Sequence, residues 1–186
     1  MLATPPPQDY LDAAIAALRN GPDWRVILDE LPVPVYLTDA VGAVTYWNRA
    51  CVDFAGREPQ PGQDKWCVTW KLYTMTGERL PHEDCPMAEA IKERKQVRGK
   101  VAVALRPDGT RRAFAPYPTP IFGSDGELEG AVNMLIDVTH EQAGALSDQA
   151  AWCRRLARNT HDSRASEILV NMARGYDATA ALLKTE

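Results

Sequence analysis

The interval between apolar residues changes repeatedly along this chain, and the order of those changes is what most limits its fold. Residues 8–31 carry apolar residues at helical spacing, residues 32–48 read as strands, and residues 139–183 return to helical spacing. Between them, a helical middle rich in proline, glycine and aromatic residues is followed by further strands. This order fits an antiparallel sheet with helices on one face, an α+β fold.

The strand-like segments are separated by short turn sequences, which predicts hairpins. Gly42 lies in the first turn, Pro107–Thr110 in a later one and Ser124–Gly126 in the last. Pro116, Pro118 and Pro120 interrupt the fourth segment, so part of it must lie at a sheet edge or a bulge. The last segment is the most apolar in the chain, which predicts a central strand. The five predicted strands are residues 32–39, 42–48, 97–105, 112–122 and 130–138.

Helix signals surround these strands. Asn48 is a predicted N-cap for a helix over 49–55, and Asp84 is another, with Pro86 in the first turn of its helix. Thr139 and Gln142 have the spacing of a capping box. The remaining predicted helices are residues 8–19, 23–31 and two C-terminal helices joined at 159–162 as a hairpin, while residues 57–81 are predicted to be loops and short turns.

Composition excludes several classes of protein. The 186 residues are 45% hydrophobic and 25% charged, as in ordinary globular proteins. The net charge is -4, so the chain lacks the overall excess of positive charge that is typical of nucleic-acid-binding proteins. No apolar run reaches the length of a membrane span and no signal-peptide pattern is present. The four cysteines form no CxxC pair, so we expect reduced thiols and a cytoplasmic location; they are Cys51, Cys67, Cys85 and Cys153.

Catalytic motifs are missing from the sequence. It contains no GxSxG, no P-loop, no HExxH and no GxGxxG after a strand. His140 and His161 fall at predicted helix junctions, where capping or helix-dipole interactions explain them. We therefore expect that the protein is not an enzyme and holds no metal.

Over residues 30–141 the sequence resembles the PAS family of sensor and interaction domains. Five short stretches carry the resemblance through their order and spacing: Leu31–Asp39, Gly42–Ala50, Arg106–Thr110, Asp125–Gly130 and Asp137–Thr139. The segment from Trp66 to Met87 is similar to a bacterial PAS subgroup that is commonly attached to signalling kinases. The resemblance implies a PAS domain over 32–140, an N-terminal helical extension over 1–31 and a C-terminal helical hairpin over 141–186.

The family resemblance also implies an architecture and a site. It implies a five-stranded antiparallel sheet in the order 2-1-5-4-3, with helices over one face and a small-ligand cavity between sheet and helices. The candidate cavity walls are Tyr36, Phe54, Met87, Ile91, Val103, Phe114, Tyr117, Asn133 and Leu135. Asn133 is a polar residue in the most apolar strand, so its amide must either bond a neighbouring side chain or face a ligand or water.

The PAS cofactors can be compared with the sequence. Flavin photochemistry needs a cysteine in an Asn-Cys-Arg-Phe-like motif, and Cys67 lacks those neighbours. His82 is the candidate ligand for a haem, but it precedes the predicted helix and is equally explained as a partly exposed loop residue. We therefore expect no resident cofactor, and a small-molecule ligand of unknown identity stays open.

The flanking helices are the predicted working surface. Their apolar stripes pack either on the domain or on a partner, and we expect a homodimer through them; the stripe residues are Leu11, Ile15, Leu18, Leu146, Ile168, Met172, Tyr176 and Leu183. No effector module is recognisable in the sequence. We expect a single-domain signalling or adaptor protein that regulates a bacterial phosphorelay, of the kind that controls motility or the cell cycle, with a histidine kinase or another regulator as partner. The alternative is a haem-bearing or other cofactor-bearing gas or redox sensor.

Overall fold

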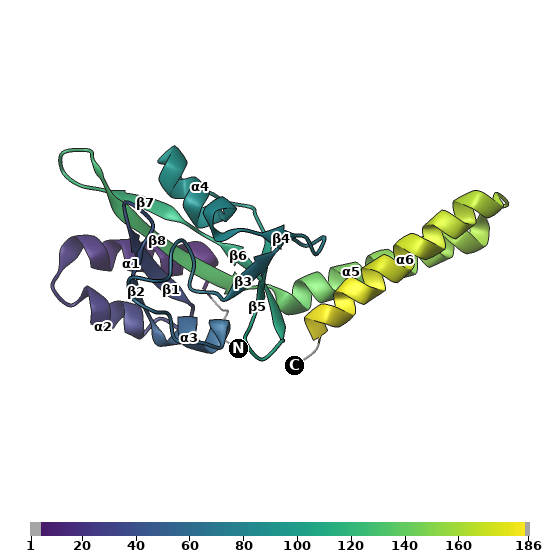
Figure 1. Cartoon of the computed structure of the whole chain (residues 1–186), viewed down its shortest axis with the longest axis horizontal. Helices are drawn as coiled ribbons and strands as arrows, with labels where there is room; N and C mark the ends of the chain where they lie inside the picture. The colour runs from purple at the N-terminus through teal and green to yellow at the C-terminus, as the bar shows by residue number, and fades with distance from the viewer. Residues whose placement is uncertain (1–4, 185–186) are drawn as a thin grey trace.

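The structure of the chain is a computed structural model that describes residues 5–184. Residues 1–4 and 185–186, the outermost parts of the two predicted extensions, lie outside the described residues. Figure 1 shows a body built on one sheet and a pair of long helices that extend from it. The eight strands of the sheet are β1 (Val35–Asp39), β2 (Val44–Trp47), β3 (Lys71–Tyr73), β4 (Arg79–Leu80), β5 (Ala102–Leu105), β6 (Arg111–Pro116), β7 (Thr119–Phe122) and β8 (Leu128–Asp137).

The strand order confirms the predicted fold. All pairings are antiparallel and the sheet runs β2-β1-β8-β6-β5-β3-β4, with β7 also paired to β8. The five predicted strands correspond to β1, β2, β5, β6 with β7, and β8, so their order is 2-1-5-4-3 as expected. Strand β8 lies at the centre and its residues 130–135 are all buried. Both faces of the sheet are therefore covered at this strand.

Two details of the predicted strands are wrong. The region 57–81, predicted to contain only loops and turns, includes the hairpin of β3 and β4, which extends the sheet beyond β5. These strands have three and two residues, too few for an alternating pattern to stand out. The segment 112–122 forms two strands, β6 and β7, which pair with successive parts of β8. The chain is interrupted between them at Tyr117 and Pro118, where the proline has no N–H for the ladder.

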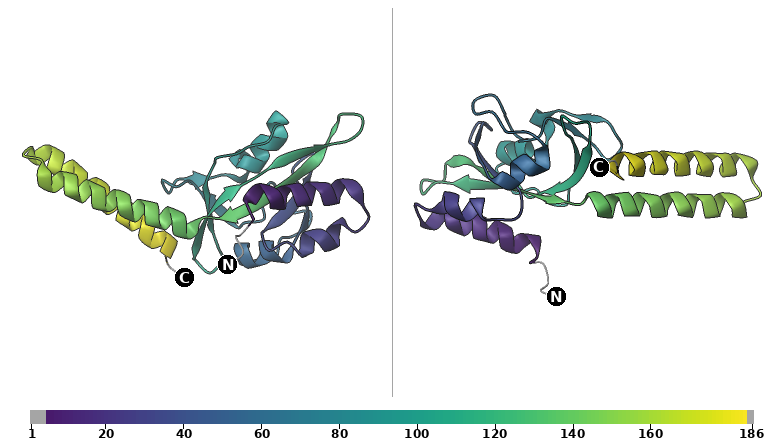
Figure 2. Two further views of the ribbon diagram at one scale, coloured as in Figure 1. Left: turned by 180° about the vertical axis from the view of Figure 1, so that it is seen from behind. Right: turned by 90° about the horizontal axis from the view of Figure 1, so that it is seen from below.

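Helices cover both faces of the sheet. Figure 2 shows α3 and α4 on one side and α1 and α2 on the other. Side chains alternate along a strand, so Ala131 and Leu135 of β8 face α3 and α4, whereas Val132 and Met134 pack against Leu11 of α1. The predicted N-terminal extension thus shares a core with the sheet. The short helices of the body are α1 (Pro7–Asn20), α2 (Trp24–Asp29), α3 (Arg49–Ala55), the 3-10 turn η1 (His82–Asp84) and α4 (Pro86–Glu93).

Asn48 ties the first helices to the sheet. Its side-chain oxygen accepts hydrogen bonds from the backbone N–H groups of Val35 and Cys51, and its amide donates to the carbonyls of Leu28 and Val33. The residue is buried, so these bonds satisfy groups that have no access to water. The predicted N-cap of α3 is confirmed, and the same side chain also fixes where α2 ends and β1 begins.

Two predicted caps are wrong. The N-cap of α4 is Cys85, because Asp84 belongs to the 3-10 turn; Pro86 is the first residue of the helix, as expected. Thr139 is the first residue of α5 (Thr139–Asn159), and its hydroxyl interacts with Asp137 and the Ala113 carbonyl instead of forming a capping box.

The helices α5 and α6 (Ser163–Lys184) form the predicted hairpin, which projects from the body and meets it at one end (Figures 1 and 2). At that end Leu183 and Ala143 pack with Val103 and Ala113 of the sheet. Asp162 accepts hydrogen bonds from the backbone N–H groups of residues 164 and 165, and so caps the second helix. Within residues 5–184, no helix combines the length and the apolar character that crossing a bilayer requires.

Candidate functional site

The interior between the sheet and the helices α3 and α4 is one continuous cluster of buried side chains. Six of the nine predicted cavity residues belong to it, which are Tyr36, Phe54, Met87, Ile91, Phe114 and Leu135. The rings of Phe54 and Phe114 meet edge to face, with 5.6 Å between their centroids. The predicted residues are therefore brought together by α3, α4 and three different strands. In this structure they pack as a hydrophobic core.

Val103 and Tyr117 do not join this cluster. Val103 packs with the base of the helical hairpin, and Tyr117 belongs to the cluster beneath α1 and α2. Both were predicted as cavity walls because they are apolar or aromatic residues of strands. The alternation of side chains places them on the opposite face of the sheet.

Both the oxygen and the nitrogen of the Asn133 side-chain amide form hydrogen bonds within the protein. Its oxygen accepts a 2.9 Å hydrogen bond from the backbone N–H of Tyr117, and its nitrogen donates to the Tyr36 hydroxyl at 2.9 Å. The Tyr36 hydroxyl in turn donates to the carbonyl of Trp66, also at 2.9 Å. Of the two alternatives stated for Asn133, the structure shows the internal one. Burial raises the pKa of the Tyr36 phenol well above its usual value, so this hydroxyl keeps its proton.

Trp66 closes this network in a backbone conformation that is rare for a residue with a side chain. Its φ is 69°, in the left-handed region, and its N–H donates to the carbonyl of Gly42 at 2.7 Å. A Cβ on Gly42 would lie 2.2 Å from the Trp66 ring, so only glycine allows this approach. The 23 residues between them contain no motif that indicates the contact. Sequence reasoning therefore missed the contact by which Trp66 covers the interior at this edge.

Three cysteines share the interior cluster. Cys51, Cys67 and Cys85 are buried and free. Burial raises the pKa of all three thiols, that of Cys85 to about 12, so each stays protonated and unreactive. Residues 5–184 contain no group of three or more His, Cys, Asp or Glu side chains arranged to hold a metal ion.

His82 lies in the 3-10 turn before α4, as the sequence indicated. Its Nε2 is buried and has no hydrogen-bond partner among the described residues. Burial lowers its pKa, and Asp64 opposes that shift in part, while Arg79 and Arg57 add to it. These charged neighbours do not fit a haem site, which needs apolar walls around the porphyrin. The structure therefore offers no support for His82 as a haem ligand.

Besides the interior, the second candidate site is one face of the α5–α6 hairpin. The contact between the two helices is made largely by small side chains, including Ala150, Cys153 and Ala173. The large apolar residues instead point outward: Trp152 is 56% exposed, Ile168 53% and Met172 45%. Trp152 and Met172 border a groove of about 510 Å³, called here the apolar face. It is lined by Asp148, Gln149, Trp152, Cys153, Arg155, Leu156, Leu169, Met172 and Tyr176.

The predicted stripe residues divide between two roles. Leu11 is fully buried on the sheet, and Ile15, Leu18, Leu146 and Leu183 pack within the chain. Met172 and Tyr176 line the apolar face, and Ile168 lies one helical turn before Met172. Within the described residues, the N-terminal stripe is therefore occupied by the chain's own sheet. In the C-terminal stripe, Ile168 and Met172 remain open to solvent.

Comparisons with known proteins agree with this architecture. A family model described as PAS fold matches residues 28–143. The LOV protein of Rhodobacter sphaeroides is similar over 95% of this chain and 96% of its own, with 16% identity and a TM-score of 0.45. The PAS domain of the fruit-fly ELK potassium channel is similar over 61% and 93%, with 13% identity and a TM-score of 0.49. No curated protein sequence matches. Identities this low are no basis for transferring a ligand or a partner to this chain.

The hydrogen-bond network at Tyr36 gives a stability prediction. Tyr36→Phe removes the hydroxyl, so the side-chain nitrogen of Asn133 loses its acceptor and the Trp66 carbonyl keeps only a 3.9 Å contact from the Cys85 thiol, both in a buried site. We expect the free energy of unfolding to fall by about 1–3 kcal/mol, measured by chemical denaturation. The matched control is Tyr73→Phe on β3, whose hydroxyl makes no hydrogen bond with the described residues. Equal stabilities of the two variants would show that the network does not stabilise the interior.

The buried imidazole of His82 predicts a dependence of stability on pH. Its pKa in the folded state lies below its ordinary value of 6.5, so the unfolded chain takes up a proton first as the pH falls. The contribution of this residue is present in full above pH 6.5 and is lost progressively below it. We expect His82→Gln to reduce the loss of unfolding free energy between about pH 7 and about pH 5, and the exposed control His161→Gln to leave it unchanged. Identical pH profiles for wild type and His82→Gln would contradict this assignment.

Proposed function

This chain belongs to the PAS fold family, and from that premise we propose that it is a signalling adaptor that regulates a bacterial phosphorelay through protein contacts. In this proposal the PAS body is the regulated part and the α5–α6 hairpin is the output surface. A histidine kinase or another regulator of the phosphorelay receives the signal, in a pathway such as motility or the cell cycle. The protein acts in the cytoplasm and catalyses no reaction of its own; four free cysteines suit that reducing compartment.

The observation that carries the proposal is the exposed apolar face of the hairpin. A helix pair held together mainly by alanine and cysteine contacts buries little apolar area of its own. Its largest apolar side chains, Trp152 and Met172, face solvent instead. Exposed apolar patches of this kind are typical of protein interaction sites.

A second copy of this chain fits the apolar face. Helices of 21 and 22 residues are about 32 Å long, and packed helices lie about 8–10 Å apart. One face of the hairpin therefore offers about 600 Å² per copy, which places a symmetric pair near the lower end of stable interfaces. Two hairpins meeting face to face would form a four-helix bundle, in which each apolar face covers the other.

The junction of hairpin and body supports a route from the PAS domain to this surface. Strand β8 leads through Val138 directly into α5. The Thr139 hydroxyl interacts with the carbonyl of Ala113 on β6, and Arg112 forms a 2.8 Å ion pair with Asp137. A shift of β6 or β8 would therefore tilt the hairpin and change how its faces are presented. The input in this proposal is a small molecule taken up between the sheet and α3 and α4.

Self-association through the apolar face can be measured directly. We expect the wild-type chain to show twice its 20.6 kDa mass by size-exclusion chromatography with light scattering. Trp152→Glu and Met172→Glu place charges in the bundle core and should each yield the monomer mass. Val41→Glu, at a residue that is 63% exposed on the PAS body, is the matched control and should remain a dimer.

Circular dichroism of each variant establishes that the helices still form. A wild-type chain that elutes at monomer mass at every loading concentration would refute dimerisation. An unchanged dimer in both glutamate variants would refute the apolar face as its interface.

The proposed input can be tested on the purified protein. We expect native mass spectrometry to detect a small, mainly apolar molecule bound to a fraction of the chains, because the interior it enters is lined by apolar side chains. Replacing Phe114 by Trp would fill that interior and should abolish the adduct, while Phe122→Trp at an exposed position of β7 should retain it. A Soret or flavin absorbance band in the wild type would favour the cofactor-bearing sensor instead. Wild-type chains that never carry an adduct would remove the ligand from the proposal.

A further inference from the structure

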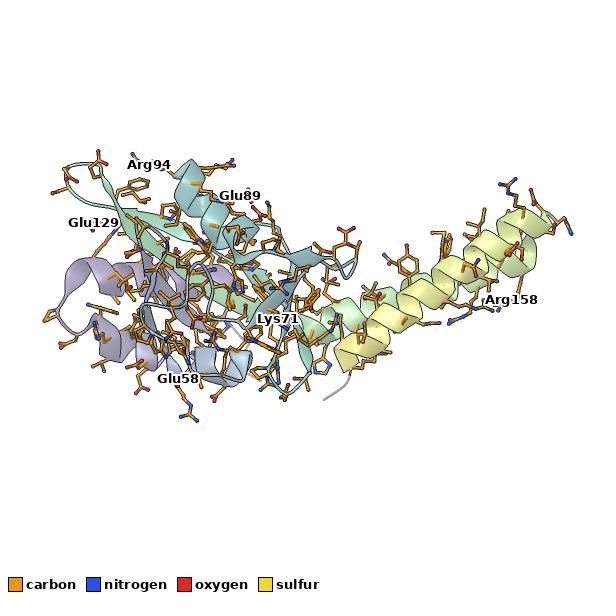
Figure 3. The ribbon with its side chains drawn as sticks, viewed as in Figure 1. Glu58, Lys71, Glu89, Arg94, Glu129 and Arg158 are labelled. Atoms are coloured by element: carbon orange, nitrogen blue, oxygen red, sulfur yellow. The ribbon has the colours of Figure 1, made fainter. Side chains whose placement is uncertain are left out.

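The side of the hairpin opposite the apolar face carries a second groove, of about 290 Å³, that is lined by arginines. Its residues are Arg154, Ala157, Arg158, Ser166, Val170, Ala173 and Arg174, called here the arginine groove. Its alanines are buried, and Ser166 and Val170 are half-buried, so these side chains form the floor of the groove, whereas the three arginines are exposed. Figure 3 labels Arg158, near the far end of the hairpin.

Two of the three arginines have no acidic partner within residues 5–184. Arg154 forms an ion pair with Asp177. Arg174 makes only a 3.4 Å hydrogen bond to Asn171, and no ion pair involves Arg158. The acidic residue nearest to Arg158 along the chain, Asp162, caps α6, and the one nearest to Arg174, Asp177, is paired with Arg154.

Positive charge is concentrated in this part of an otherwise acidic protein. Residues 150–175 contain five arginines and two acidic residues, so their net charge is five minus two, or +3, while the whole chain carries -4. The outer half of the hairpin therefore attracts anionic surfaces that the rest of the chain repels.

We propose that the arginine groove binds an acidic helix of a partner protein. Arg158 of α5 and Arg174 of α6 both line the groove and have no acidic partner within residues 5–184, so carboxylates of a helix that lies in the groove can meet them. The buried alanines of both helices allow the backbone of a bound helix to approach closely. The planar guanidinium group pairs with carboxylates through two parallel hydrogen bonds. This inference rests on the proposed function and adds to it the chemistry of the partner.

The shape of the groove favours a helix over nucleic acid or a membrane. A nucleic acid or an anionic bilayer needs a broad array of cations, whereas here two unpaired guanidinium groups flank an apolar floor. The floor supplies contact for the small apolar side chains of an amphipathic helix. The groove also lies on the face that a hairpin–hairpin dimer leaves open.

The test uses the full chain, labelled with ¹⁵N, and a synthetic helical peptide as the probe. The peptide carries glutamates at positions four residues apart with alanines between them, and a matched peptide carries glutamine in place of each glutamate. We expect saturable amide shifts in residues 154–158 and 166–174 with the glutamate peptide only. Arg158→Gln with Arg174→Gln should weaken binding about fivefold or more. The control pair Arg49→Gln and Arg94→Gln removes the same charge from the PAS body and should leave the affinity unchanged.

Several outcomes would overturn the inference. The glutamate peptide could cause no amide shifts, or cause shifts only in residues of the apolar face. The glutamine peptide could cause equal shifts, or the shifts could persist in the double groove variant. It would also be overturned if a single-stranded RNA oligomer or phosphatidylserine vesicles shifted the groove while the glutamate peptide did not. Light scattering on the same samples separates this result from the dimer. A dimer without groove shifts keeps the proposed function and removes only this inference.

Discussion

The burial of β8 on both faces is the constraint on which the rest of the structure depends. Its backbone pairs with β1 along one edge and with β6 and β7 along the other. Its alternate side chains provide the centre of the core beneath α3 and α4 and of the core beneath α1 and α2. If the helices on either face of this strand moved away, its apolar side chains would be exposed to water. Because α5 begins directly after it, this strand also sets the direction in which the hairpin leaves the body.

The sequence predicted the parts of the fold that strong local patterns control. The apolar run at 130–138 marked the central strand, and Asn48 marked the start of α3, because burial and capping each act over a few neighbouring residues. The missed strand β3 is held by pairing with β5, a contact far along the chain, and β4 in turn pairs with β3. The same limit applies to the interior. Apolar character alone selected Val103 and Tyr117, but the register of the sheet decides which face each residue occupies.

Two of the sharpest features of the interior also lie beyond local pattern. Trp66 adopts a positive φ because a contact with Gly42 and a hydrogen bond from Tyr36 hold it there, and neither is visible in its neighbours along the chain. The hairpin is a different case. Its helical periodicity was readable, yet only the structure separates its residues into an inter-helix contact of small side chains, an apolar face and an arginine groove. In the proposed function, one helical hairpin uses these surfaces to contact a second copy and a partner at once.

The central claim is that the exposed apolar face of the α5–α6 hairpin is covered by a second copy of the chain. Hydrogen exchange of the backbone amides, followed over a series of protein concentrations, tests it most directly. The account predicts that exchange in residues 148–176 slows as the concentration rises, while exchange in β8 stays constant because its protection comes from within the chain. Exchange in the hairpin that is fast and independent of concentration would contradict the claim.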